Sequence, residues 1–157
     1  FAAKLADSNY TYTVESITVT GAKGGTATYT FGGTEGKGGN WNITGSAPAS
    51  GYSYTFDNTV TAKDGIYDYT QNDNSLMLYP QSLTDAKIIV KYKTEKDNAT
   101  FFNDSKEVSL TGEWTNGQSI RYILTLPVGA EEMSVNTTYD ENWDATDNEQ
   151  TPKNPAS

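Results

Sequence analysis

The sequence predicts an all-β fold, a two-sheet Greek-key β-sandwich of about eight to ten strands. Three observations support this prediction. The chain is rich in Thr and contains 11 tyrosines, and both residue types favour pleated, half-buried strands. Its 14 glycines and many Asn and Asp residues supply tight turns. Turn signals recur roughly every 8–12 residues, and no window of about 11 residues places apolar side chains at helical spacing.

The first half of the chain contains several strand patterns separated by turns. Residues 10–20 alternate polar and apolar side chains, but Val14 has one parity and Ile17 has the other. Because a regular strand cannot bury both sets, we expect a bulge near Glu15 and Ser16. Further strands are expected at residues 26–31, around residues 41–43, at residues 52–61 and at residues 67–69.

The second half contains the most characteristic stretch. Residues 76–79 are apolar on both faces, which predicts a central strand that ends at Pro80. The next strand is predicted at residues 87–92, where every second residue is apolar, and residues 94–104 are expected to form a loop. Residues 120–126 alternate without a break and predict the best single strand. The remaining strands are expected to begin at residue 108 and to span residues 133–139.

These elements fit one domain. The chain has 157 residues, enough to bury a sizeable core. We expect residues 1–145 to form a single β-sandwich domain and the acidic residues 146–157, with two prolines, to form a flexible tail. No signal peptide is visible, so Phe1 is expected to be either a mature terminus or an artificial boundary of the sequence.

Composition excludes several classes of function. The net charge is −9, the pI is about 4.3 and Arg121 is the only arginine, so nucleic acid is not an expected partner. No apolar run approaches the roughly 18 residues of a transmembrane helix. The chain lacks both Cys and His, which removes disulfides, a Ser-His-Asp triad and a Cys-His pair. We therefore expect a protein that is not an enzyme and needs no cofactor.

One acidic segment resembles a weak calcium site. Asp140, Asn142 and Asp144 alternate there, and oxygen ligands suit a hard cation. A loop of the EF type requires Gly at its sixth position, where Ala145 stands. A solvated acidic tail is the preferred interpretation.

Aromatic side chains suggest a second class of function. Trp41 and Trp114 are predicted in loops, where exposed and coplanar rings would form a sugar-stacking platform. Tyr92 and Tyr122 share the parity of their apolar neighbours, which favours a core position for both. The alternative to a structural protein is thus a secreted carbohydrate-binding β-sandwich.

Four spaced segments together resemble one extracellular family, the fimbrillin-type subunits of type V pili. The first is the start of the chain, Phe-Ala-Ala-Lys-Leu-Ala. The second is an apolar strand that ends in Pro-Gln and is followed by a strand flanked by lysines. The third is a Trp that precedes a Gly turn and a Tyr-rich strand, and the fourth is a closing strand that ends in Trp-Asp. These segments lie at residues 1–6, 76–92, 113–126 and 135–144. The similarity is to the C-terminal, transthyretin-like domain of such subunits.

The resemblance implies an exported fimbrial subunit at the cell surface, beyond the outer membrane, with a structural or adhesive role. Its partners would be other pilin subunits, in a homopolymer or heteropolymer, and host or bacterial surface glycans or proteins. Family members are cut by a protease and polymerise by exchange of β-strands. They usually have two such domains, and this chain is long enough for one.

A donated strand must alternate and must be detachable, since its main chain forms the ladder and its alternate side chains fill pockets. The preferred candidate is the segment near the C-terminus that contains Met133, Val135, Thr137 and Tyr139. Residues 1–5 are the other candidate. For both segments, the alternative is an ordinary strand that completes its own sandwich.

Overall fold

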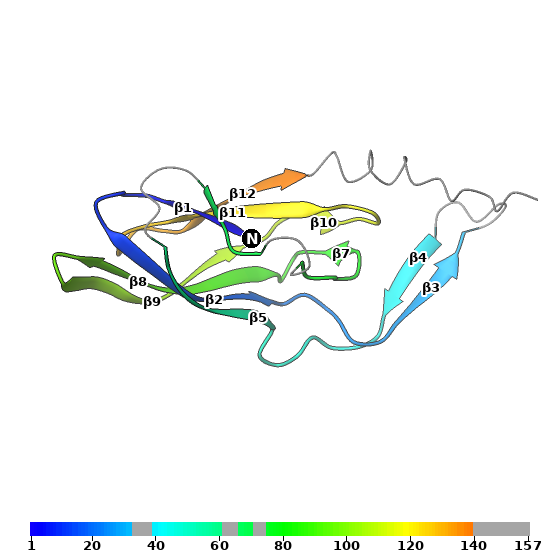
Figure 1. Cartoon of the computed structure of the whole chain (residues 1–157). Coiled ribbons are helices and arrows are strands. Elements are labelled where there is room, and N and C mark those ends of the chain that lie inside the picture. Colours follow the sequence, from blue (N-terminus) through cyan, green and yellow to red (C-terminus); the bar gives the residue numbers. More distant parts are fainter. Residues whose placement is uncertain (33–38, 61–65, 71–74, 140–157) are drawn as a thin grey trace, which may run out of the picture.

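The structure, a computed structural model, describes residues 1–32, 39–60, 66–70 and 75–139. These ranges contain twelve strands and no helix (Figure 1). The strands are β1 (Ala2–Leu5), β2 (Thr11–Thr20), β3 (Ala27–Phe31), β4 (Gly39–Ile43), β5 (Tyr52–Val60), β6 (Ile66–Asp68), β7 (Gln81–Ser82), β8 (Lys87–Lys96), β9 (Ala99–Ser109), β10 (Glu113–Trp114), β11 (Ile120–Leu126) and β12 (Ser134–Tyr139).

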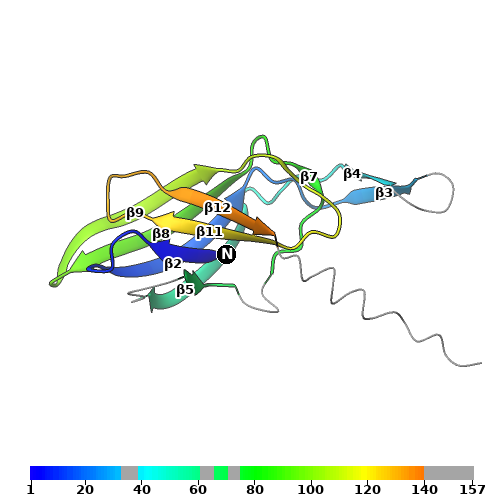
Figure 2. The same ribbon diagram turned by 90° about the horizontal axis from the view of Figure 1, so that it is seen from above.

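Two four-stranded sheets pack face to face and confirm the predicted all-β sandwich (Figures 1 and 2). The strand order is β12-β11-β1-β6 in one sheet, the β1 sheet, and β5-β2-β8-β9 in the other, the β8 sheet. Apolar side chains from both sheets fill the space between them, with Val14, Ile88 and Leu124 fully buried. Burial of such residues is the main source of stability in a fold without disulfides.

The β8 sheet follows the predicted alternation. In β8, Ile88, Val90 and Tyr92 are buried while Lys91 is exposed. The register of β2 shifts between Val14 and Ser16 against both of its neighbours. This irregularity is the predicted bulge, and it lets residues of opposite parity on either side of it face the same core.

Two predictions about the strands are wrong. Residues 94–104 are not a loop, because β8 and β9 form a long hairpin around Asp97 and Asn98. Both residues have positive φ, 51° and 62°, as a two-residue type I′ turn requires. The polar character of the segment concealed an edge strand, whose side chains are largely exposed.

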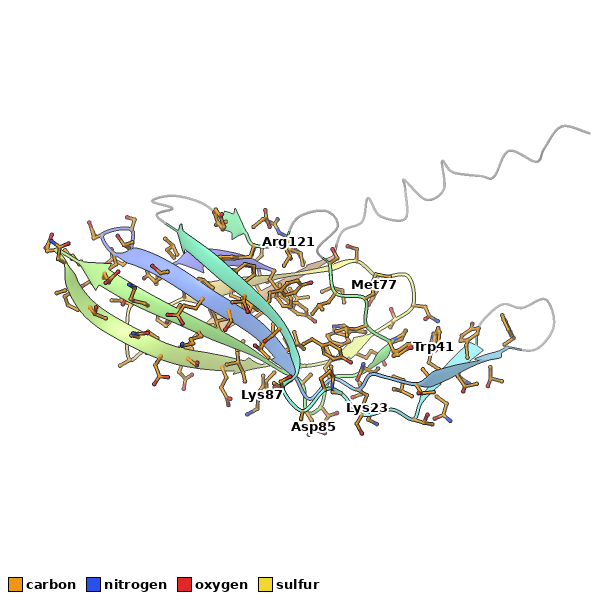
Figure 3. The ribbon with its side chains drawn as sticks, turned by 60° about the horizontal axis from the view of Figure 1, so that its bottom comes forward. Lys23, Trp41, Met77, Asp85, Lys87 and Arg121 are labelled. Carbon is orange, nitrogen blue, oxygen red and sulfur yellow. The ribbon has the colours of Figure 1, made fainter. Side chains whose placement is uncertain are left out.

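Residues 76–79 are the second correction. They form no strand, and Met77 is 90% exposed, pointing out from the end of the sandwich (Figure 3). We call residues 75–80 the strap. Side-chain hydrogen bonds hold the strap in place of a main-chain ladder: the hydroxyl of Tyr79 donates to the carbonyl of Gly25 at 3.2 Å, and Nε2 of the following Gln81 donates to the carbonyl of Lys23 at 3.0 Å. The two-faced apolar pattern therefore reflects a cover over one end of the core.

Two small sheets complete the described chain. β7 pairs with β10, and β3 pairs with β4 to form an arm that projects beyond the sandwich (Figures 1 and 2). In the ranges that the structure covers, no helix has the length and apolar character to cross a bilayer.

Candidate functional site

The first strand occupies an interior position in its sheet. β1 runs parallel to β11 on one side and antiparallel to β6 on the other, with Ala3 opposite Leu124 and Tyr67. Ala2 and Ala3 are buried, whereas Lys4 faces solvent. Because the buried side chains of β1 are small, main-chain hydrogen bonds to β11 and β6 hold the strand more than large apolar side chains do. We call the space between β11 and β6 the β1 slot.

Aromatic and main-chain contacts fix the two ends of β1. The ring of Phe1 stacks on that of Tyr122, with centroids 6.0 Å apart, and meets the edge of Tyr54 at 6.1 Å. At the other end, the N–H of Ala6 donates to the carbonyl of Leu126 at 3.0 Å. The strand is thus aligned along the C-terminal half of β11, residues 123–126.

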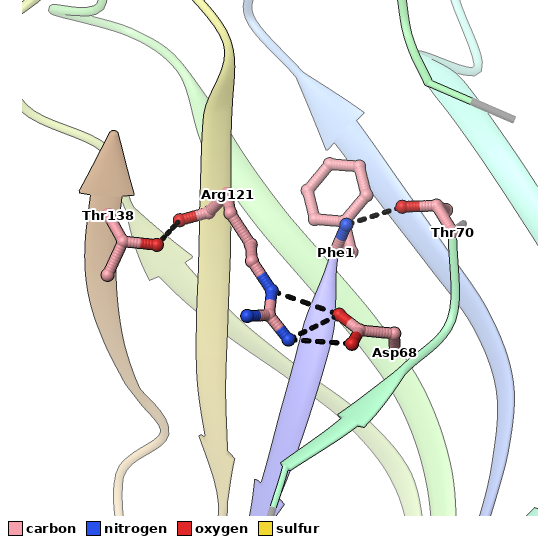
Figure 4. Close-up of polar contacts among 5 residues, drawn as sticks. All are labelled: Phe1, Asp68, Thr70, Arg121 and Thr138. Atoms are coloured by element: carbon pink, nitrogen blue, oxygen red, sulfur yellow. Dashed lines mark hydrogen bonds and ion pairs between the residues drawn. The ribbon is translucent and has the colours of Figure 1, made fainter. Parts of the chain in front are cut away.

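An ion pair crosses the slot at its upper end (Figure 4). Arg121 of β11 donates through Nη2 to both carboxylate oxygens of Asp68, at 2.6 and 2.7 Å, and through Nε to Oδ1 at 2.9 Å. Asp68 belongs to β6, so the pair joins the two strands that flank β1. Both side chains are partly exposed. The fork shape of guanidinium gives this contact a defined geometry that Lys cannot reproduce.

A cleft of about 750 Å³ continues from the slot toward the strap. Its polar walls include the Arg121–Asp68 pair, Thr70 and Gln118, and its apolar walls include Leu76. The cleft runs beside residues 120–122 of β11, which precede the four residues that pair with β1. The β1 slot is therefore occupied along one half of β11 and open along the other.

The predicted donor strand pairs with its own sheet here. β12 lies antiparallel to β11 at the edge, with Val135 opposite Leu124 and Thr137 opposite Tyr122. Met133 is buried just before the strand, Val135 packs against the core and Thr137 is exposed. Tyr139 ends the strand. A single ladder therefore holds β12, whereas two ladders hold β1.

The two tryptophans predicted in loops lie instead in strands, Trp41 in β4 and Trp114 in β10, and in different environments. Trp114 is half-buried against the core, and its Nε1 donates to the hydroxyl of Tyr122 at 2.7 Å. Trp41 is 37% exposed on the arm, and its Nε1 donates to Oδ1 of Asn116 at 2.9 Å (Figure 3). The Trp41 ring is tilted by 49° and 45° to those of Tyr29 and Tyr79. The aromatic side chains of the arm therefore do not share one plane.

The weak calcium candidates Asp140, Asn142 and Asp144 and the predicted tail at residues 146–157 lie outside the described residues. Within the described ranges, no three acidic side chains gather in a way that could hold a metal ion.

Sequence reasoning missed the Asp68–Arg121 pair and the cleft. The only arginine of an acidic chain was the available signal, because a single guanidinium among many carboxylates finds a partner readily. Which carboxylate it meets depends on the pairing of β1 with β6, and that pairing joins segments more than 60 residues apart.

Comparison with known proteins returned no match among family models, curated proteins or solved structures.

Proposed function

We propose that this chain is an exported, non-enzymatic subunit of a cell-surface fibre of the fimbrillin type, which joins its neighbours by β-strand addition and needs no cofactor. One observation carries the proposal: β1 is short, lies between two strands and pairs with only the last four residues of β11, beyond which a cleft opens. The spaced motifs that resemble fimbrillins point to the same class.

The β1 slot is suited to accept a strand from a neighbouring subunit. β1 pairs with four residues of β11, Ile123 to Leu126, although β11 spans seven. A longer donor would form the same ladder and extend it along Ile120–Tyr122, while its side chains entered the cleft. The new ladder would be longer than the β1 ladder that it replaces, and this gain would offset part of the cost of removing the donor strand from its own sheet.

β12 is suited to donate. It lies at an edge, and its departure breaks one ladder. Its alternation places Met133, Val135 and Thr137 on one face, where Met133 is buried and Val135 packs against the core, and places the exposed Ser134 and Asn136 on the other. A groove with spaced pockets reads such a pattern. Partners would then be other copies or related subunits, with surface glycans or proteins as further ligands of the finished fibre.

Deletion tests the donor. Removal of residues 133–157 is expected to abolish assembly, observed as loss of fibres in electron micrographs and of detergent-resistant ladders on gels. Removal of residues 140–157 alone is the control and is expected to preserve assembly. Circular dichroism verifies that the shortened chain stays folded. Fibres formed without residues 133–157 would refute β12 as the donor.

A disulfide provides a second test that removes no core side chain. Ile123 and Asn136 are paired across β11 and β12, and the chain has no cysteine. An Ile123→Cys/Asn136→Cys variant is expected to assemble when reduced and to remain monomeric when oxidised. Equal assembly in both states would exclude β12 as the exchanged strand.

A carbohydrate-binding module remains the second candidate, because the arm exposes Phe31 (76%) and Trp41 (37%). Glycan-array binding that is lost in a Trp41→Ala variant would support it. The tilted rings give a poor flat platform, so we favour the structural role.

A further inference from the structure

We propose that the free edge of β9 is a self-complementary interface, through which two copies of this chain pair side by side about a twofold axis at Ser105. The pairing is antiparallel and joins the two β8 sheets into one. The inference is independent of strand exchange, because β9 belongs to the sheet opposite β1.

β9 is a long and accessible edge. It spans eleven residues, pairs only with β8 and is the outermost strand of its sheet (Figure 2). Most of its side chains are exposed, and no proline interrupts it. An edge of this kind offers a row of main-chain groups to another strand.

The direction of these main-chain groups follows from one hydrogen bond. The N–H of Leu110 donates to the carbonyl of Ala86 at 2.8 Å, and these two residues continue the register in which Lys87 faces Ser109. Successive residues of an antiparallel strand direct their N–H and C=O groups to opposite sides. The even-numbered residues of β9 therefore direct these groups toward β8. The residues that turn to the free edge are Asn103, Ser105, Glu107 and Ser109.

The side chain of Asp104 marks the same edge. Its Oδ1 accepts the N–H of Ser105 at 2.7 Å, which shows that this N–H is not used by β8. In the single chain, the carboxylate thus occupies a donor that a second strand would use. When two copies pair, the N–H of Ser105 donates instead to the carbonyl of Ser105 in the second copy. The carboxylate of Asp104 is then free to contact another group.

Charge selects the partner. With Ser105 opposite itself, Asp104 faces Lys106 of the second copy and Lys106 faces its Asp104, so symmetry forms the ion pair twice. In the same register, Phe102 faces Val108 of the second copy. Phe102 and Val108 both pack against the core, so this contact extends the apolar face.

The same charges discourage other strands. Lys106 is half-buried, with Nζ 5.2 Å from the centre of the Phe102 ring, and lies on the inward side of β9 together with Asp104. A strand without a matching acid and base would cover both charges and leave them unpaired. A second copy in this register is the occupant that satisfies both.

Charge reversal tests the interface in the chain as it stands. Sedimentation equilibrium from about 1 µM to about 1 mM is expected to show a monomer–dimer equilibrium for the native chain. Asp104→Lys or Lys106→Asp alone creates two like-charge contacts and is expected to weaken dimerisation about tenfold or more. The double variant exchanges the charges and is expected to restore it. Glu113→Lys on β10, which changes the net charge as Asp104→Lys does, is expected to have no effect.

Cross-linking tests the register. Ser105→Cys places two thiols opposite each other on the axis and is expected to form a disulfide-linked dimer under mild oxidation. Ser109→Cys, on the same edge, lies far from its own copy and is expected to stay monomeric. A native chain that is monomeric at all concentrations, a double variant that fails to recover, or equal cross-linking at both positions would overturn the proposal. None of these outcomes depends on β1 or β12, so they leave strand exchange untouched.

Discussion

Arg121 and Asp68 form a forked ion pair over the start of β1, with Nη2 of the guanidinium 2.6 and 2.7 Å from the two carboxylate oxygens. The two residues lie on β11 and β6, which flank β1 and have no ladder with each other. The pair is therefore a direct side-chain link across β1, the strand that we propose to be displaced by the donor.

Substitution of Arg121 tests this link. Arg121→Gln is expected to lower the free energy of unfolding by about 1 kcal/mol, and Arg121→Lys by nearly as much, since Lys cannot donate two parallel bonds. Both variants are expected to speed hydrogen exchange at Ala3 and Leu5. Urea unfolding and exchange measured by NMR check these outcomes.

Lys91→Gln is the control, because it breaks the exposed pair between Lys91 and Glu15. Its expected effect on stability is small compared with that of the Arg121 variants, because exposed ion pairs contribute little. If Arg121→Lys keeps full stability and native exchange rates, the fork geometry has no role in holding β1.

Two buried tyrosine hydroxyls differ in their partners. Tyr92 donates to the carbonyl of Pro127 at 2.8 Å, whereas the hydroxyl of Tyr69 is buried with no hydrogen-bond partner among the described residues. Tyr92→Phe is expected to cost about 1 kcal/mol, and Tyr69→Phe is expected to be neutral or stabilising. Urea midpoints of the two variants measure the difference. Equal losses in both would mean that the Tyr69 hydroxyl has a partner after all.

Alkaline pH is expected to unfold the chain. Burial raises the pKa of Tyr92 and of Tyr12, and the two rings stack with centroids 6.2 Å apart. The folded state therefore holds these protons more tightly than the unfolded state, whose tyrosines ionise near pH 10. Stability is fully present below about pH 10 and is lost as the pH rises above it.

Urea midpoints between about pH 8 and pH 11.5 test this expectation. Tyr92→Phe is expected to flatten the decline, because one of the shifted groups is gone. A decline of unchanged steepness in that variant would assign the alkaline sensitivity to other groups.

Local alternation predicted the strands that form the core. Residues 120–126 coincide with β11, and the change of parity in residues 10–20 located the bulge in β2. Both features depend on neighbouring residues alone, since the side-chain period of a strand is two. The sandwich follows from the number of such strands and the turns between them.

The position of β1 could not be predicted in the same way. Its place between β11 and β6 is set by pairing with residues more than 60 positions away, and Ala2 and Ala3 give it little apolar signature. The strand predicted at residues 76–79 failed for the opposite reason, because its apolar pattern was strong but the segment forms no ladder. Leu76 packs against the core and Met77 points outward. Apolar residues on alternate sides are compatible with a cover as well as with a central strand.

The most direct test of strand exchange is to lock β1 in its slot. Lys4 and Ile66 are exposed antiparallel partners on β1 and β6, so Lys4→Cys/Ile66→Cys closes a disulfide over the slot without touching the core. Thr28→Cys/Asn42→Cys, across the arm, is the matched control. If assembly proceeds by strand exchange, the oxidised β1 lock blocks fibre assembly, reduction restores it and the arm lock has no effect. Fibres that form equally well from the oxidised β1 lock would contradict the account.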